Sequence, residues 1–459
     1  MTADIITADN WHASSDVLGH PRGLTVLAGT ELWERISFHG MVALLTLYMA
    51  EQLLMPGHIE HIVGFAGFRA GIEWMTGPLS AEALAAQIFG LYIGLIYFTP
   101  VLGGLIGDRL TGRRNAVTAG ALLMTGGHFC MAFDQSFLLA LLLLILGAGL
   151  LRGNLLAQVG YLYAEGDRRR TDAFQIYYSV VNFGAFVAPL ITGALGQSYG
   201  WHYGFGFAGF GMLAGLVIYL LGQRHLPADR PRTQRAVAAK MTAKDRRVVL
   251  ILILLVPVLS LYWVVNAQEW NVYNLWARDH VDLTVYGWQM PVPWVQSLAA
   301  IACVVLVPAV LGFWRWLALR GLEPDEFGKL AMGCLIVGAF TAWDASGTMI
   351  FGAAGKMPLV WIVISNFAIS FGYLHVQPVA IALFARTAPK PVNAMMIGVY
   401  FLAIFLGSIV SGRLGGLYES LSATQFWLLH AALAGLAGLI FLALGPLLRR
   451  ELPASLSTY

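Results

Sequence analysis

Long apolar stretches separated by short polar breaks dominate the pattern of hydrophobic and polar positions along this chain. A helix needs about 20 mostly apolar residues to cross a bilayer, because it rises only about 1.5 Å per residue. Twelve stretches meet this requirement, so the pattern predicts twelve membrane-spanning helices. Their expected ranges are 24–50, 84–106, 115–133, 137–160, 174–197, 203–222, 248–276, 293–314, 328–345, 358–384, 394–416 and 425–447.

A polar interruption divides the predicted spans into two groups of six. Residues 224–247 read RHLPADRPRTQRAVAAKMTAKDRR and are polar, basic and proline-containing. Such a composition is typical of a linker rather than of a packed element. We therefore expect an all-α membrane protein with an N-terminal six-helix bundle (1–222), a cytoplasmic basic linker (223–247) and a C-terminal six-helix bundle (248–459).

The composition favours lipid over water as the environment of most of the chain. Of 459 residues, 58% are hydrophobic and only 12% are charged, whereas soluble domains carry about 25% charged residues. Too little polar surface would remain to cover a soluble globule of this size. The composition thus excludes a soluble enzyme, a disordered scaffold and a secreted disulfide module. The net charge of +3 gives no reason to expect a nucleic-acid partner.

The distribution of positive charge predicts the orientation in the membrane. Most of the 28 Lys and Arg residues fall on one side of the predicted spans, while Arg69, Arg278 and Lys356 fall on the other. Because Lys and Arg are retained preferentially on the cytoplasmic side, we expect a multi-pass protein with both termini in the cytoplasm. The polar segment before the first span does not resemble a cleavable signal peptide.

The first predicted span contains a group of charged residues. Within ELWERISFHG at 31–40, Glu31, Glu34 and Arg35 lie within one helical turn, and His39 follows one turn later. A charge near mid-membrane costs roughly 3 kcal/mol on insertion scales, so it is retained where it lines a polar cavity or pairs with another charge. Two carboxyl groups beside one Arg indicate a titrating site suited to proton coupling. A static ion pair that fixes helix register is the alternative.

Other polar residues within the spans are candidates for substrate contacts. Arg152 in the fourth span could pair with a first-span Glu or bind a substrate carboxylate or phosphate. Asn182 in the fifth could bond a substrate or join two helices. Glu269 lies late in the seventh span. Three residues on apolar helices have no second ligand at metal-binding spacing and are expected to be bonded core histidines: His128, His375 and His430.

We recognise no enzyme or receptor pattern. The chain has no HExxH, GxSxG or GKS motif and no paired aspartates at catalytic spacing. The three cysteines, Cys130, Cys303 and Cys334, predict neither a disulfide nor a metal site, because they are irregularly spaced in apolar runs. Residues 51–82 form the longest stretch outside the predicted spans and are too few for a soluble output domain. We expect neither an enzyme nor a metal or cofactor.

Several ordered motifs resemble the proton-dependent oligopeptide transporter family of the major facilitator superfamily. Residues 31–40 resemble ExxERFxxYG, with Ile36 for Phe and His39 for Tyr. Residues 97–114 resemble the loop between spans two and three, residues 174–184 resemble FYxxINxG, and GWHYGFG at 200–206 matches a run at the start of span six. The resemblance implies the major facilitator fold of two six-helix bundles. It also implies a monomeric carrier of the bacterial inner membrane.

The resemblance assigns roles to residues in the N-terminal half. In this family an inward proton gradient drives peptide uptake by alternating access, with no cofactor besides the proton. Glu31, Glu34 and Arg35 would form the proton-coupling cluster. Arg152 would meet the peptide carboxylate and Asn182 the peptide backbone. Two further residues, in the loop after span two, would form an inside latch that gates the carrier: Asp108 and Arg109.

The C-terminal half departs from the family pattern. Ala267 replaces the span-seven Glu of WxxxEQ, and Ala299 replaces the span-eight Asn of QSxN. Tyr373 replaces the span-ten Glu of GELxxSPxGL, which holds the peptide amino group in the family. An ammonium group left without a partner would cost several kcal/mol. We therefore expect peptides or peptide-like compounds with a modified or absent free amino end.

The alternative is a proton-coupled exporter of drugs or metabolites. The candidate substrate-binding residues are Arg35, His39, Arg152, Asn182, Glu269, Tyr373 and His375.

Overall fold

Helices make up almost all of the regular structure in the computed structural model, which describes residues 17, 19–164, 167–227, 241–352, 355–389 and 392–452. This agrees with the predicted all-α class. The described residues form α1 (Arg22–Tyr48), α2 (Phe65–Thr76), α3 (Ala81–Ile106), α4 (Arg113–Cys130), α5 (Phe137–Tyr161), α6 (Arg169–Tyr199), α7 (Trp201–Gly222), α8 (Ala243–Gln268), α9 (Tyr273–His280), α10 (Trp294–Leu319), α11 (Glu326–Phe351), α12 (Leu359–Thr387), α13 (Asn393–Gly415) and α14 (Ala423–Glu451).

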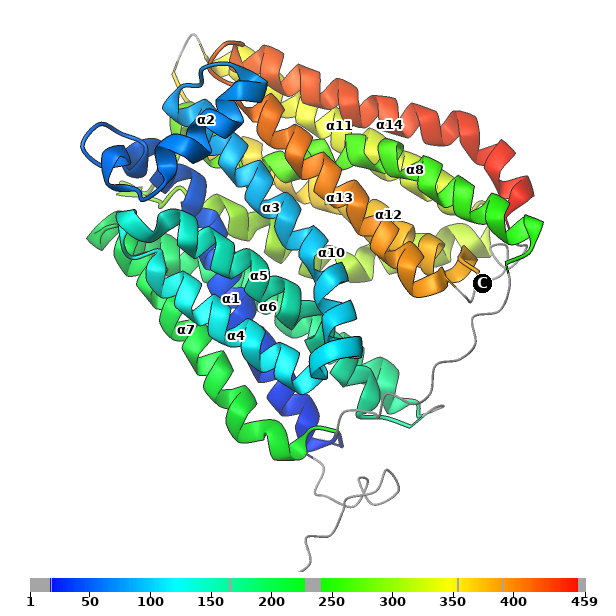
Figure 1. Cartoon of the computed structure of the whole chain (residues 1–459). Helices are drawn as coiled ribbons and strands as arrows, with labels where there is room; N and C mark the ends of the chain where they lie inside the picture. The colour runs from blue at the N-terminus through cyan, green and yellow to red at the C-terminus, as the bar shows by residue number, and fades with distance from the viewer. Residues whose placement is uncertain are drawn as a thin grey trace, which may run out of the picture. The chain divides into compact units, whose positions relative to one another are not determined.

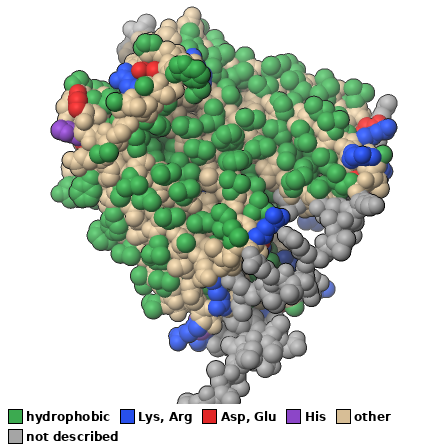
Figure 2. All heavy atoms as spheres, in the orientation of Figure 1, with side chains coloured by type: hydrophobic (Ala, Val, Ile, Leu, Met, Phe, Trp, Pro, Cys, Tyr) green, Lys and Arg blue, Asp and Glu red, His purple; other side chains and the backbone are tan. Residues whose placement is uncertain are grey.

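Ten helices of the described chain are long and apolar enough to cross a membrane: α3, α5–α8 and α10–α14. Figure 2 shows hydrophobic side chains over most of one face, with few charged side chains, mainly near its margins. Large apolar residues that would be costly to expose to water are suited to contact with lipid tails. The chain is therefore a multi-pass membrane protein.

Helices α1 and α4 also match predicted spans but are not among these ten. Helix α1 carries Glu31, Glu34 and Arg35 within its 27 residues. Helix α4 has only 18 residues and begins with two arginines and an asparagine. Composition alone therefore does not assign these two helices to the membrane, and the count of twelve spans stays a prediction.

The predicted seventh span, 248–276, is wrong in its extent, because the helix breaks. Helix α8 ends at Gln268, and α9 begins at Tyr273. The intervening backbone turns through bonds that reach back three residues, such as Asn271 N–H to the Gln268 carbonyl at 3.1 Å. Two buried side-chain amides anchor the break, since Asn271 donates to the Ala86 carbonyl and Asn274 to the Ala43 carbonyl.

The predicted linker, 223–247, is described only at its two ends, because residues 228–240 lie outside the described chain. Helix α8 already begins within the predicted linker, at Ala243. Thr242 and Asp245 form a capping box there: the Asp245 N–H donates to Thr242 Oγ1 at 3.1 Å, and the Thr242 N–H donates to Asp245 Oδ2 at 2.8 Å. Such reciprocal bonds satisfy N–H groups that the first turn leaves open.

The chain divides into two compact units, described here separately. The first comprises the described residues up to 41 and from 99 to 227, and the second comprises 42–98 and the described residues from 241 onward. In the first unit, α4 packs against α5 and α7, and α6 packs against α7. In the second, α11 packs against α12 and α14, and α8 packs against α13 and α14 (Figure 1).

Short strands of the second unit follow α9. Strand β1 (Val281–Asp282) pairs in parallel with β4 (Met357–Pro358), and β2 (Thr284–Val285) pairs with β3 (Trp288–Gln289) as a hairpin. The hairpin turn has positive φ at Tyr286 (50°) and Gly287 (81°), which matches the twist of antiparallel strands.

A salt-bridge network lies beside these strands. Arg278 contacts Glu51, Glu82 and Asp279, with nitrogen–oxygen distances of 2.9, 3.2 and 2.7 Å. Partial burial opposes the charged form, but the bonds to carboxylates outweigh it and raise the pKa of Arg278.

Candidate functional site

The three charged residues of α1 form a buried ion-pair cluster in the first unit. Glu31 is 4% exposed and Glu34 is fully buried. Arg35 Nε lies 2.9 Å from Glu31 Oε1 and 2.5 Å from Glu34 Oε2. The three- and four-residue spacing of a helix brings these groups together, as the sequence predicted. One guanidinium group is thus shared by two carboxyl groups.

Arg152 on α5 completes the charge balance of this cluster. Its Nε and Nη2 atoms both lie 3.1 Å from Glu34 Oε1. Its guanidinium carbon lies 4.0 Å from the centroid of the Phe38 ring, a favourable position for a cation over an aromatic face. The predicted pairing between Arg152 and a first-span Glu is therefore present. Among the described residues, Glu34 contacts two guanidinium groups, whereas Glu31 contacts that of Arg35.

Tyr177 on α6 supplies the second contact of Glu31. Its hydroxyl group donates a hydrogen bond of 2.5 Å to Glu31 Oε2. Helix α6 can approach α1 at this level because a Cβ atom at Gly184 would lie only 2.7 Å from Arg35 Cβ. Tyr177 lies within the motif at 174–184, but the sequence alone assigned it no role. A phenol group in an apolar span was the available signal.

His39 and Asn182, two predicted substrate contacts, lie on the same pair of helices. His39 is partly buried on α1, with its ring 5.1 Å from that of Phe38. Asn182 is partly buried on α6, five positions after Tyr177. Both residues therefore belong to the helices that form the cluster, and their contacts with substrate stay predictions.

The predicted core histidines differ in their bonding. His375 and His430 each place Nδ1 near a backbone carbonyl four residues earlier, at 2.6 and 2.8 Å. His128 on α4 is fully buried, but neither of its ring nitrogens has a hydrogen-bond partner among the described residues. The expectation that His128 is a bonded core residue is therefore wrong. It lies close enough to Glu34 for an electrostatic interaction.

The predicted inside latch lies on a π-helical turn, Gly107–Thr111, after α3. Asp108 Oδ1 lies 2.8 Å from Arg113 Nε and 2.7 Å from its Nη2 atom. Arg109 is exposed on the same turn. Asp108 is adjacent to Arg109 in the sequence, but it forms its ion pair with Arg113 at the start of α4. The gating role of Asp108 and Arg109 stays a prediction.

In the second unit the predicted residues lie in two different surroundings. Tyr373 on α12 is partly buried, with its ring 6.5 Å from that of Trp263. Glu269, just after α8, is close enough to Tyr373 for an electrostatic interaction. His375 is fully buried beside aromatic rings, with Phe371 at 4.6 Å and Trp314 at 4.8 Å. The structure thus brings Glu269 toward Tyr373 and places His375 in an aromatic core.

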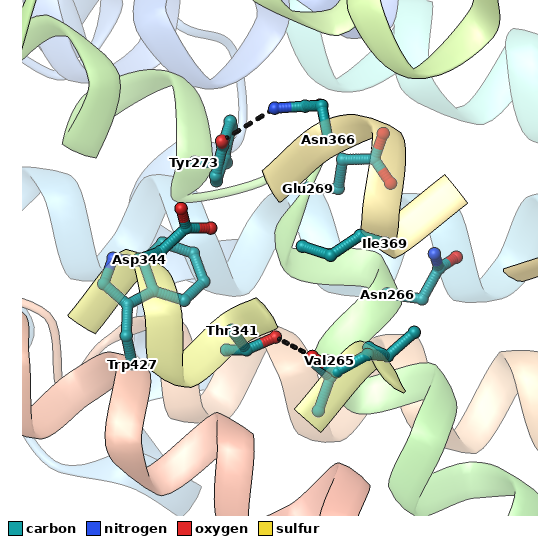
Figure 3. A pocket seen from close by; sticks show the side chains of 10 residues that line it. Val265, Asn266, Glu269, Tyr273, Thr341, Asp344, Asn366, Ile369 and Trp427 are labelled. Carbon is teal, nitrogen blue, oxygen red and sulfur yellow. Dashed lines mark hydrogen bonds between the residues drawn. The ribbon is translucent and has the colours of Figure 1, made fainter. Parts of the chain in front are cut away.

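A carboxyl group that sequence reasoning missed lies near Glu269. Asp344 on α11 is 1% exposed and lines the same small cavity as Glu269 (Figure 3). Its position within the predicted span 328–345 was the available signal, because buried ionisable residues in spans are usually functional. Asp344 lies one residue from the end of that range, so the sequence alone is equally compatible with a position at the membrane surface.

Comparison with known families decides the family of this chain. A sequence model described as the POT family matches residues 114–244 and 232–428, which together cover more than half of the chain. The chain belongs to the POT family. The predicted family resemblance is thereby confirmed, and this POT family protein is a member of a transporter family.

Curated relatives match this POT family protein over nearly its whole length. The peptide transporter YePEPT of Yersinia enterocolitica is 28% identical, over 89% of this chain and 90% of the relative. A di-/tripeptide transporter of Lactococcus lactis subsp. cremoris is 27% identical, over 92% and 95%.

Solved structures resemble it as well. A peptide transporter, crystallised as a mutant with sulfate, has a TM-score of 0.85 and 26% identity over 97% of this chain and 99% of that one. A mutant complex with alafosfalin has a TM-score of 0.84 and 26% identity, over 98% and 100%.

Proposed function

We propose that this POT family protein is a proton-coupled symporter that imports peptides or peptide-like compounds by alternating access. The proposal includes the finer predictions of architecture: twelve membrane spans in two six-helix bundles (1–222 and 248–459) joined by the linker 223–247. It also includes a monomer in the bacterial inner membrane with both termini in the cytoplasm. The names of the curated relatives, which are peptide transporters, support the cargo class.

The observation that carries this proposal is the buried cluster of two carboxyl groups and two guanidinium groups. Each Arg is compensated only while a carboxylate beside it is ionised. When a proton neutralises Glu34, the Arg152 guanidinium group loses its carboxylate partner and becomes available to an anionic substrate group. A carboxylate substrate end and a proton would thus bind together, which is the linkage that symport requires.

Arg35 and Arg152 would hold the acidic end of the cargo in this scheme. Both guanidinium groups lie near the Phe38 ring, at 5.6 and 4.0 Å, so both are kept at one level of the helix bundle. The related transporter crystallised with sulfate is consistent with an anion-binding role. His39 and Asn182, on the same two helices, would contact the remaining polar groups of the cargo.

The preferred cargo would lack an ordinary free amino end. Ala267, Ala299 and Tyr373 stand where the family resemblance implies groups that hold the peptide amine. An ammonium group transferred from water without a partner loses several kcal/mol. We therefore propose N-modified peptides or peptide conjugates as better substrates than free dipeptides.

Transport into liposomes tests the coupling. Purified protein is reconstituted with a pH dye inside, and an inward proton gradient is imposed. Glu34→Gln should abolish proton-driven accumulation while retaining some substrate–substrate exchange, because the uncharged isostere cannot release a proton. The control is Glu326→Gln, which alters an acid paired with Arg386 outside the cluster. Normal accumulation by Glu34→Gln would contradict the coupling role.

The same liposomes test the cargo class. The outside solution contains a free dipeptide, its N-blocked form, or a larger peptide conjugate. Internal acidification with the blocked and conjugated compounds, but not with the free dipeptide, is the expected result. An equal response to the free dipeptide would refute the proposed preference. No response to any compound would refute proton-coupled peptide uptake.

A further inference from the structure

A second buried acidic site lies in the second unit, and its described lining residues include no Arg or Lys. Its cavity has a volume of about 30 Å³, enough for a single water molecule. Figure 3 shows the side chains of Asp344, Tyr273 and Glu269 among those that line this pocket. The ten lining residues come from α8, α9, α11, α12, α14 and the turn after α8: Val265, Asn266, Glu269, Tyr273, Val337, Thr341, Asp344, Asn366, Ile369 and Trp427.

Asp344 is the least compensated member of this group. It is 1% exposed, and its Oδ1 atom has no hydrogen-bond partner among the described residues. The hydroxyl group of Ser365 on α12 is a polar neighbour that forms a hydrogen bond with the carboxyl group. A carboxylate buried without a cation costs several kcal/mol, whereas the neutral acid avoids most of that cost. Burial here therefore favours a carboxyl group that holds a proton.

The titratable groups around the cavity add no positive charge. Tyr273 on α9 interacts with both Asp344 and Glu269. Its hydroxyl oxygen accepts a 2.9 Å bond from Asn366 Nδ2, which leaves its own hydrogen available to an acceptor. Three further groups on α8, α10 and α12 interact with Glu269, and each becomes negative rather than positive on titration: Tyr262, Cys303 and Tyr373.

His430, beside the lining residue Trp427, is already engaged. On α14, His430 places its Nε2 atom 3.1 Å from Gln268 Nε2 and its Nδ1 atom 2.8 Å from the Phe426 carbonyl. On α13, Tyr400 interacts with Tyr262 and Tyr373 rather than with either acid. None of the described residues that line the cavity is basic, so a positive charge that neutralises its carboxyl groups has to come from outside this lining.

We propose that Asp344, assisted by Glu269, is a proton-binding site of the second unit, separate from the α1 cluster. The inference rests on the proposed proton coupling. The cavity size excludes a peptide terminus with its attached chain, whereas a water-sized space suits a proton delivered by a water molecule. Glu269 is the partly exposed member of the pair, so it would exchange protons with water and Asp344 would store one.

Infrared difference spectroscopy of the reconstituted protein tests the site directly. The carbonyl stretch of a protonated carboxyl group is followed while the pH of the perfusing buffer is changed. Asp344→Asn should remove one protonated-carboxyl band that persists at neutral pH. Glu269→Gln should shift the pH at which that band titrates. The control, Asp282→Asn, makes the same chemical change at an exposed residue and should leave the band unchanged. A band unaffected by Asp344→Asn would overturn the proposal.

Transport then tests whether the bound proton is used. Asp344→Asn should lower the proton-to-substrate ratio while substrate–substrate exchange persists, which shows that the variant is folded. An unaltered ratio would overturn the role in coupling. If sodium ions stimulate uptake by the unmodified protein but not by Asp344→Asn, the site binds a metal ion and the proposed proton site is overturned. If Asp344→Asn selectively loses transport of free-amine substrates, the site binds an ammonium group and the proposal is likewise overturned. The infrared band is measured without transport. Failure of proton-driven uptake in the unmodified protein would therefore refute the proposed function but not the proton-binding site.

Discussion

The two acids of α1 are chemically unequal, although they lie three residues apart. Glu34 is fully buried between the guanidinium groups of Arg35 and Arg152. Glu31 shares Arg35 and takes its other contact from a neutral donor, Tyr177. A hydroxyl group stabilises a carboxylate less than a guanidinium ion does. Glu31 is therefore the acid whose protonation disturbs fewer charges.

Removal of the Tyr177 hydroxyl group should alter the pH dependence of transport. The ionised form of Glu31 would lose one donor, so Glu31 would bind its proton at a higher pH. A hydrogen bond to a charged group contributes about 1.5 to 3 kcal/mol, so Tyr177→Phe should move the pH of half-maximal uptake upward by about 1 to 2 units. Uptake measured across a pH series checks this. The control is Tyr178→Phe at the exposed neighbour; a similar profile for both variants would contradict the role.

Helix contacts in the first unit depend on glycine at particular positions. On α3, Gly103 packs directly against the backbone of Gly149 on α5, so an added Cβ atom would collide with the Gly149 carbonyl. At the adjacent Gly104, an added Cβ atom would meet no atom within 4 Å. Only one of these two neighbouring glycines is therefore required for a close helix contact, and the sequence pattern does not show which one.

Alanine substitutions at these two glycines should have opposite effects on stability. Gly103→Ala overpacks the α3–α5 contact and should destabilise the protein by about 1 to 3 kcal/mol. Gly104→Ala should be neutral or stabilise it by up to about 1 kcal/mol, because alanine favours helix. Thermal unfolding of both variants in one detergent gives the comparison. A lower midpoint for Gly104→Ala than for Gly103→Ala would show that the contact is not close in the native protein.

At the scale of the whole molecule, apolar helices and the few charges between them define a membrane protein. Ten helices of the described chain are long and apolar enough to span. The proposed orientation places the loop after α10 in the cytoplasm and the β2–β3 hairpin outside. Arg320 directly follows α10 in the first of these segments, and Tyr286 lies fully exposed in the second.

Labelling with a membrane-impermeant thiol reagent should report this orientation. In a variant without Cys130, Cys303 and Cys334, a cysteine at Tyr286 should be labelled in right-side-out vesicles. A cysteine at Arg320 should be labelled only in inside-out vesicles. Uptake by each variant confirms that it is folded. The reverse labelling pattern would invert the topology, and labelling of both positions from one side would contradict the proposed span count.

The sequence by itself determined the all-α class, the family and the local charge cluster. Apolar length depends only on neighbouring residues, and spacings of three and four place Glu31, Glu34 and Arg35 on one helix face whatever surrounds them. Local spacing does not reveal the break within 248–276, because that break depends on amide bonds to distant carbonyls.

Only the tertiary structure decided the remaining partners of the acids. Arg152 and Tyr177 lie 118 and 146 positions from the glutamates that they contact. The cavity that joins Asp344 to Glu269 requires several helices to meet. Such contacts depend on helix packing, which a periodic pattern along one chain segment does not encode.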